Sequence, residues 1–74
     1  MLSLPPSVKI YLASERTDMR KGFDGLMAIV KREWRLDVFS GHLFAFVGRR
    51  GDRVKLLMWD RGGFAVYYKR LERG

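Results

Sequence analysis

Three short runs of β-favouring residues between Leu43 and Leu71 constrain the fold most strongly. They read LFAFVGRR, RVKLLMWD and FAVYYKRL, and they are separated by Gly51-Asp52 and by Arg61-Gly62-Gly63. Runs rich in Val, Phe, Tyr and Trp that are broken by glycine turns are typical of antiparallel hairpins. The sequence therefore predicts a meander of three strands.

A two-residue turn at Gly51-Asp52 would fix the pairing of the first two strands. Arg50 then lies opposite Arg53, and the pairs that follow on one face are Gly48 with Lys55, Phe46 with Leu57 and Phe44 with Trp59. The other face carries Val47, Leu56, Ala45 and Met58. Both faces are partly apolar, although only one helix is available to cover the sheet. We expect one face to meet solvent, another segment or a partner.

The residues before the meander predict one strand and one helix. Side-chain character alternates with a period of two from Val8 to Ala13, which indicates a half-buried strand. Thr17 or Asp18 is suited to cap the helix that follows, because its side-chain oxygen can accept a hydrogen bond from a free backbone N–H. The helix gathers its apolar residues on one side: Met19, Phe23, Leu26, Met27, Val30 and Trp34. Gly22 and Gly25 weaken this helix by about 1 kcal/mol each relative to alanine, so its start is irregular or its backbone approaches the sheet closely.

A loop from Leu36 to His42, with a turn signal at Ser40-Gly41, connects the helix to the meander. The order of elements predicts an α+β fold, in which one helix packs on a small, mostly antiparallel sheet in the order β-α-β-β-β. The 74 residues correspond to a single small domain, residues 1–74. A chain of this size buries only about 60% of its unfolded surface, so we expect marginal stability.

Composition narrows the classes of site and of cellular location. The chain has no cysteine and one histidine, which excludes a disulfide framework and most thiolate or histidine metal sites. The first residues, MLSLPPSV, lack the basic and apolar regions of a signal peptide, and no apolar run approaches the roughly 18 residues of a membrane span. We therefore expect a cytoplasmic protein that does not bind membranes.

The acidic residues do not form an evident catalytic set. They are Glu15, Asp18, Asp24, Glu33, Asp37, Asp52, Asp60 and Glu72, scattered over turns and exposed helix positions. Asp37 and Asp60 are the two that could meet, but a two-metal site needs further carboxylates. His42 has no paired nucleophile and suits ordinary hydrogen bonding in a loop. We predict no catalytic residue, no metal site and no cofactor, with turn or cap roles for the acids.

Positive charge is the most informative feature for function. The formal net charge is +7, and residues 41–74 hold eight Lys or Arg against three acids, a net of +5. A basic excess favours anionic partners, of which nucleic acid is the commonest, although it can also serve solubility alone. We predict contact with DNA phosphates through a basic hairpin rim made of Arg49, Arg50, Arg53, Lys55, Lys69, Arg70 and Arg73.

The aromatic residues of the meander allow two interpretations. Phe44, Phe46, Trp59, Phe64 and Tyr68 would stack on bases if their sheet face were open. Aromatic side chains on a sheet are more often part of the core. The sequence leaves both interpretations open, and we expect the arginines to matter more for binding than the aromatic side.

Several strings of the sequence resemble a known family. They are residues 17–26 (TDMRKGFDGL), 39–44 (FSGHLF), 48–50 (GRR) and the stretch from Trp59-Asp60 through 68–72 (YKRLE). They are similar to TnpB, the small accessory protein encoded by the second open reading frame of the insertion-sequence-sixty-six family of bacterial transposable elements. The resemblance covers nearly the whole chain in order. Val38 stands where that family is expected to have proline, which changes the loop mildly.

The resemblance implies a protein that is encoded beside a separate transposase and is needed for efficient transposition, with no established catalytic activity of its own. Family members continue beyond the KRLERG string, so we expect this chain to lack the family's C-terminal continuation. We therefore predict a non-enzymatic transposition accessory protein whose partners are DNA at the transposon ends and the element's transposase. The alternative is a protein-interaction module that docks on the transposase or self-associates through an apolar sheet face.

Overall fold

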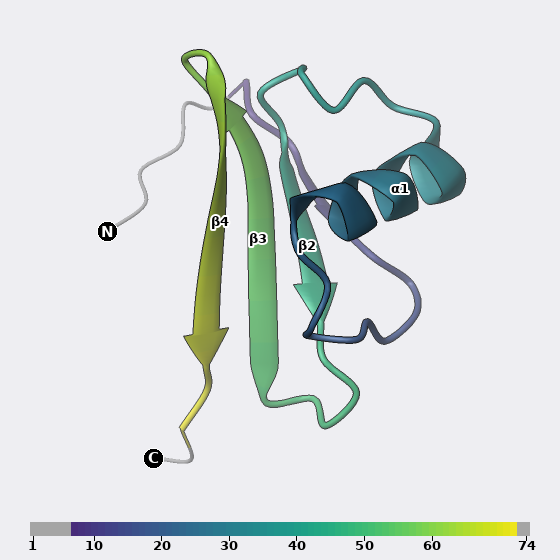
Figure 1. Ribbon diagram of the computed structural model, residues 1–74, viewed down its shortest axis with the longest axis vertical. Coiled ribbons are helices and arrows are strands. Elements are labelled where there is room, and N and C mark those ends of the chain that lie inside the picture. The colour runs from purple at the N-terminus through teal and green to yellow at the C-terminus, as the bar shows by residue number, and fades with distance from the viewer. Residues whose placement is uncertain (1–6, 73–74) are drawn as a thin grey trace.

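The computed structural model describes residues 7–72, which form one helix and a four-stranded mixed sheet (Figure 1). The elements in chain order are β1 (Ile10–Leu12), α1 (Phe23–Trp34), β2 (Leu43–Val47), β3 (Arg53–Asp60) and β4 (Gly63–Arg70). The strands lie in the order β1-β2-β3-β4; β1 pairs with β2 in parallel, and the other neighbours are antiparallel. The predicted α+β class and the predicted order β-α-β-β-β are confirmed.

The core lies between α1 and one face of the sheet. Its largest fully buried side chains are Phe44, Phe46, Leu26, Leu57 and Val30. Full burial of such a side chain contributes about 1.5–3 kcal/mol, so these five residues supply much of the drive to fold. Phe44 and Phe46 are therefore core residues, and the interpretation in which they stack on bases is wrong.

The helix begins later than the sequence suggested, at Phe23. Thr17 is buried and forms a parallel bridge with Gly48, and Asp18 accepts a hydrogen bond from the backbone N–H of Arg20 at 2.9 Å. Both candidate caps are thus used by the connection before the helix, and the prediction that either caps α1 is wrong. Gly22 is the residue that precedes the first turn, with extended backbone and no side-chain cap.

The first hairpin has a different register from the predicted one. Phe44 lies opposite Leu57 and Phe46 opposite Lys55, so the connection is a four-residue loop, residues 49–52, instead of a two-residue turn. The Gly51 N–H donates to the Gly48 carbonyl at 2.9 Å, so a hydrogen-bonded turn spans residues 48–51 inside this connection. The register is shifted by two residues, and because side chains alternate with a period of two, each residue keeps its predicted face.

The second hairpin is a tight turn at Arg61-Gly62. Asp60 pairs with Gly63, and both central residues have positive φ, 45° at Arg61 and 86° at Gly62. This conformation is the type I′ turn, whose twist matches that of the strands it joins. Gly62 is well suited to its position because it has no Cβ to clash in the left-handed region.

The helix covers one face of the sheet, and no described helix covers the other, although Leu43 and Ala45 of β2 are buried there. Tyr11 points to the helix side, where its ring stacks on Phe44 with centroids 5.6 Å apart. Ile10 and Leu12 point the other way and are 62% and 61% exposed. The first strand is thus shorter than predicted, and its aliphatic side faces out from the described part of the chain. We call this side, with Leu56 and Tyr67 of the neighbouring strands, the open face.

Candidate nucleic-acid interface

Three segments of the chain meet at one end of the sheet. The connection between β1 and α1 crosses the end of β2 at the Thr17–Gly48 bridge, where Thr17 N–H donates to the Val47 carbonyl at 2.8 Å. The end of β4 joins them, because Leu71 N–H donates to the Asp52 carbonyl at 2.6 Å. The loop of the first hairpin is therefore held between two other parts of the backbone, which positions its side chains.

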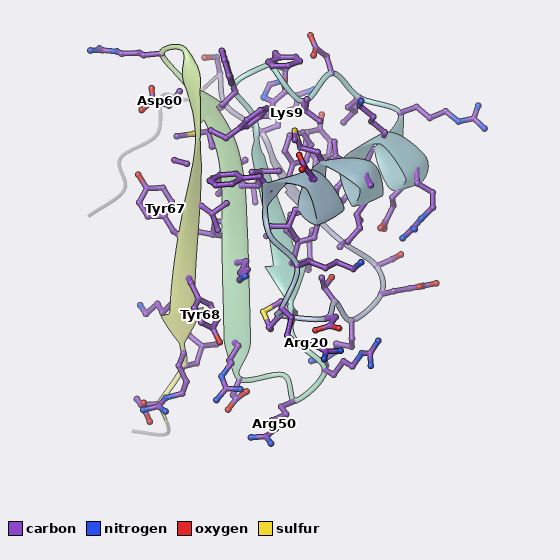
Figure 2. All side chains as sticks on the ribbon, viewed as in Figure 1. Lys9, Arg20, Arg50, Asp60, Tyr67 and Tyr68 are labelled. Atoms are coloured by element: carbon purple, nitrogen blue, oxygen red, sulfur yellow. The ribbon has the colours of Figure 1, made fainter. Side chains whose placement is uncertain are left out.

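Arginines from all three segments are gathered at this end. We define the basic rim as Arg16, Arg20, Arg49, Arg50, Arg53 and Arg70. Arg16 donates to the Gly48 carbonyl at 3.2 Å, and Arg53 lies directly opposite Arg70 in the β3–β4 register. Figure 2 shows the labelled side chains of Arg20 and Arg50 at the same end of the molecule, away from Lys9 and Asp60. Arginines gathered at one end of a fold favour a polyanionic partner.

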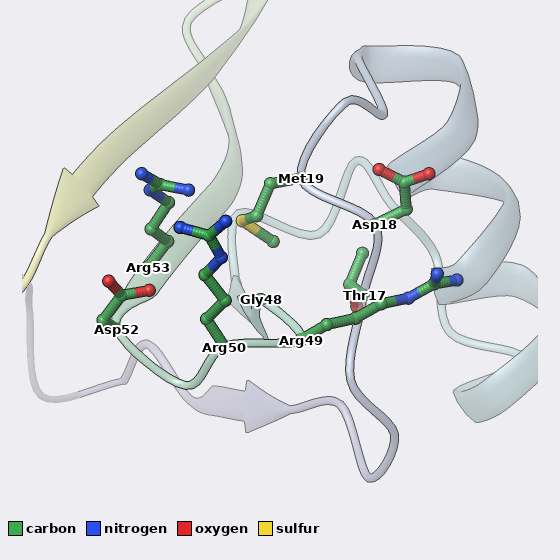
Figure 3. A pocket seen from close by; sticks show the side chains of 8 residues that line it. All are labelled: Thr17, Asp18, Met19, Gly48, Arg49, Arg50, Asp52 and Arg53. Carbon is green, nitrogen blue, oxygen red and sulfur yellow. The ribbon is translucent and has the colours of Figure 1, made fainter.

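A shallow pocket of about 150 Å³ lies within the rim. It is lined by Thr17, Asp18, Met19, Gly48, Arg49, Arg50, Asp52 and Arg53 (Figure 3). Arg50 and Arg53 point to the same side of this pocket, whereas Arg49 points away from them, toward the side of Asp18. A second pocket of about 190 Å³ lies on that other side, and Arg16, Lys21 and Arg49 contribute to its lining.

Two arginines of the rim, Arg20 and Arg70, form salt bridges with acids, and the first pair lies beside the pocket. Arg20 binds the Asp18 carboxylate at 2.8 Å and also donates to it through Nε. These hydrogen bonds, reinforced by the positive charges of Arg20 and Arg49, hold the pKa of Asp18 well below its usual range. The same carboxylate raises the pKa of Arg20. The Arg20 side chain is 90% exposed, so this pair contributes little to stability and leaves the guanidinium open to a further partner.

The seven residues predicted for DNA contact do not all lie together. Arg49, Arg50 and Arg53 are in the rim, and within residues 7–72 no carboxylate forms a salt bridge with them. Arg70 is also in the rim but pairs with Glu72 at 2.8 Å. Arg73 lies outside the described residues.

The two lysines of the predicted set lie on opposite faces. Lys55 is on the helix-covered face, where its ammonium donates to the Lys21 carbonyl at 2.9 Å and lies 5.3 Å from the centre of the Tyr68 ring. Lys69 pairs with Val54 in the register and therefore points to the open face. The structure thus separates Lys69 from the other described members of the set.

The predicted set of DNA contacts was drawn only from the meander, so it did not include Arg16, Arg20 and Lys21. A strand, a helix and a second strand in succession are typical of a parallel crossover, which places the end of the first strand beside the end of the second. That pattern was present in the sequence and would have located residues 14–22 next to the first hairpin. The basic end is therefore larger than the hairpin alone.

Two of the polar residues considered for catalysis have clear structural partners. His42 Nδ1 accepts a hydrogen bond from Lys9 N–H at 3.1 Å, which confirms its predicted loop role. Asp37 accepts from Phe39 N–H at 2.9 Å and so stabilises a turn, as predicted for the acids. Among residues 7–72 no three His, Asp or Glu side chains are close enough to hold a metal ion. The single helix of this region is too short to cross a membrane.

Comparison with known proteins gives one family and two curated relatives. The family model described as "IS66 Orf2 like protein" matches residues 8–74. Protein y4hO of Sinorhizobium fredii (strain NBRC 101917 / NGR234) is 38% identical over all 74 residues, which span 64% of its length. Protein y4jC of the same strain is 32% identical over all 74 residues, which span 63% of its length. The chain thus spans just under two thirds of these relatives, and no solved structure matches it.

Proposed function

The chain belongs to the IS66 Orf2-like family of transposition-associated proteins, and from this premise we propose that it assists transposition by contacting DNA phosphates through the basic rim. In this proposal it has no catalytic role and acts in the cytoplasm, beside the element's transposase. The rim positions the protein on the ends of the element, and the chemistry belongs to the transposase.

The observation that supports the proposal is the gathering of six arginines from three segments at one end of the sheet. A guanidinium presents a planar fork of donors that matches two phosphate oxygens. Contacts of this kind position a protein on a backbone without reading its sequence. Binding by the rim is therefore weak and sensitive to salt, because each neutralised phosphate releases bound cations.

A salt titration tests the proposal. Fluorescence anisotropy with DNA from the element ends should show binding at 50 mM salt and a loss of roughly a thousandfold in affinity by 200 mM, if about six phosphates are neutralised. Replacing Arg49, Arg50 and Arg53 together with alanine should lower the slope of log affinity against log salt by about three.

The matched control also removes three positive charges, but away from the rim. Lys9, Lys31 and Arg61 are exposed and line neither pocket, and Lys9 and the turn that holds Arg61 lie at the opposite end of the sheet. Their replacement with alanine should leave the slope close to that of the parent protein. Absence of binding at 50 mM salt, or equal losses in the two triple variants, would refute contact through the rim.

The open face favours a second candidate function, docking on the transposase or on a second copy of this chain. Ile10, Leu12 and Tyr67 expose 62%, 61% and 46% of their surface on this face. Exposed apolar patches of this kind are common at protein interfaces. Under this alternative, replacing Ile10 and Leu12 with serine should abolish retention of purified transposase or dimer formation, while the rim variant keeps both.

A further inference from the structure

A second surface continues from the basic rim along the helix-covered side of the sheet. Side chains alternate between faces along a strand, so Arg53, Lys55, Leu57 and Trp59 of β3 lie on one side, with Arg70, Tyr68, Val66 and Phe64 opposite them on β4. Helix α1 lies over β2 (Figure 1), and at the β4 end of this side the side chains of Tyr68 and Arg70 remain exposed. We call the row formed by Arg53, Lys55, Tyr68, Phe64, Trp59 and Phe39 the β3–β4 strip.

The strip changes in character along its length. Its first part is basic: Arg53 faces Arg70, and the Lys55 ammonium lies 5.3 Å from the centre of the Tyr68 ring. Tyr68 is nevertheless 57% exposed, so much of its surface remains available. Lys55 lies opposite Tyr68 in the register, which brings a positive charge and an aromatic surface together at one place.

The far part of the strip is an aromatic cluster. The Trp59 and Phe64 rings have centroids 4.9 Å apart, and Phe39 from the loop before β2 packs edge-on against Trp59 at 4.9 Å. Phe39 is 56% exposed although it is in contact with two other rings. Six residue steps separate Arg53 from Trp59, which corresponds to roughly 20 Å along a strand. The strip thus runs from cationic groups to aromatic groups over a distance that several extended nucleotides can cover.

We infer that the β3–β4 strip binds single-stranded DNA, with phosphates on the basic rim and bases against Tyr68 and the Phe39 cluster. The inference rests on the proposed contact between the rim and DNA, and it names the form of DNA. In a duplex the bases are stacked inside, so exposed aromatic rings have no base surface to contact. Unpaired bases present both faces, and stacking on aromatic side chains beside a cationic groove is how single strands are bound without sequence preference.

The opposite side of the same two strands has a different composition. Tyr67 and Lys69 project there, beside Val54, Leu56 and Met58. That side has one lysine and mostly aliphatic neighbours, and it carries none of the rim arginines of β3 or β4. Charge complementarity therefore places a polyanion on the strip and not on the open face.

Tyr68 and Tyr67 form a matched pair for the test, because they are adjacent, similarly exposed at 57% and 46%, and on opposite faces (Figure 2). We would measure binding of an oligothymidylate, of a duplex of equal length and of an oligouridylate by anisotropy at 50 mM salt. Tyr68→Ala should weaken binding of the oligothymidylate by roughly 5- to 150-fold, the loss expected for one stacked base. Tyr67→Ala and Tyr68→Phe should stay close to the parent protein.

A second readout does not depend on the tyrosines. In a Trp34→Phe background, which leaves Trp59 as the one tryptophan, the oligothymidylate should quench the fluorescence and the duplex should not. Thermal melting of each variant confirms that it is folded. Equal effects of Tyr68→Ala and Tyr67→Ala on the oligothymidylate, or no quenching of Trp59, would overturn the inference. Tighter binding of the oligouridylate than of the oligothymidylate would overturn the assignment to DNA.

The two levels of the proposal fail in different ways. If the duplex binds with the expected salt dependence and Tyr68→Ala has no effect, contact between the rim and DNA stands, and binding of single strands by the strip is refuted. If neither nucleic acid binds the parent protein at 50 mM salt, contact between the rim and DNA is refuted, and the strip falls with it.

Discussion

Gly48 lies where the connection before the helix crosses the end of β2, and it is the residue on which the geometry of the basic rim depends. An alanine Cβ at this position would lie 2.8 Å from Cγ of Met19 and 3.5 Å from Cβ of Arg53. Contacts between carbon atoms are normally near 3.5–4.0 Å, so Met19 or the backbone must move. Gly48 is also the partner of Thr17 in the parallel bridge, which leaves the backbone little freedom to move away.

The change in the free energy of unfolding that Gly48→Ala causes follows from two opposing effects. Adding a methyl group to a tightly packed site costs about 1–3 kcal/mol. Replacing glycine also restricts the unfolded chain, which stabilises the folded state by about 0.4–1 kcal/mol. We therefore expect Gly48→Ala to lower the free energy of unfolding by about 1–2 kcal/mol, measured by urea denaturation. In a domain of this size that loss lowers the melting temperature by roughly 4–16 °C.

Two further variants identify the cause. Gly63→Ala is the matched control, because no atom lies within 4 Å of its Cβ position and its φ is not positive, so it should be neutral or slightly stabilising. Met19→Ala removes the group that the new methyl meets, so the double variant with Gly48→Ala should be less destabilised than the sum of the two single variants. Additive effects, or a Gly48→Ala protein as stable as the parent, would refute the close approach of these segments.

Two further changes test local features of the fold. Ser14 N–H donates to the Glu33 carboxylate at 2.7 Å, and this hydrogen bond lowers the pKa of Glu33. The stability that the ionised carboxylate contributes is therefore present above the unfolded pKa of about 4.3 and is lost as pH falls through the folded pKa. Glu33→Gln should therefore destabilise the protein at pH 7 and less so at pH 3, as urea denaturation at the two pH values would show. Gly62→Ala places a Cβ at a φ of 86°, so it should lower the free energy of unfolding by about 1–2 kcal/mol; a melting temperature equal to that of the parent would contradict the type I′ turn.

Local sequence signals were sufficient for the elements and for the faces of the sheet. Phe44, Phe46 and Leu57 were assigned to one face from alternation alone, and they are the core of that face. The assignment survived a wrong loop length because the error was two residues, and a shift by an even number preserves the face of every side chain. The choice between a two-residue and a four-residue loop depends on the hydrogen bond between Gly51 and Gly48, and the sequence allows either.

The interpretation of residues before the helix failed for a tertiary reason. Thr17 has the side chain of a good helix cap, and local propensity offers no reason to reject it. In the fold its backbone pairs with Gly48 in the parallel bridge, and its side chain is buried. A contact between residues 31 positions apart overrides the local preference. The same contact brings Arg16 and Arg20 to the first hairpin, so the missed cap and the missed rim residues have one cause.

The rim and the strip place different requirements on a nucleic acid, and this separates their roles. Arg50 and Arg53 point to the same side of the rim pocket, and Arg53 also begins the strip, so a backbone that enters at the pocket continues toward Tyr68. A duplex can satisfy the arginines but offers nothing to Tyr68 and Phe39, which expose more than half of their surface. A strand that separates from its partner satisfies both. In our proposal the protein therefore acts at a junction, with the rim on paired phosphates and the strip on the bases that have left the duplex.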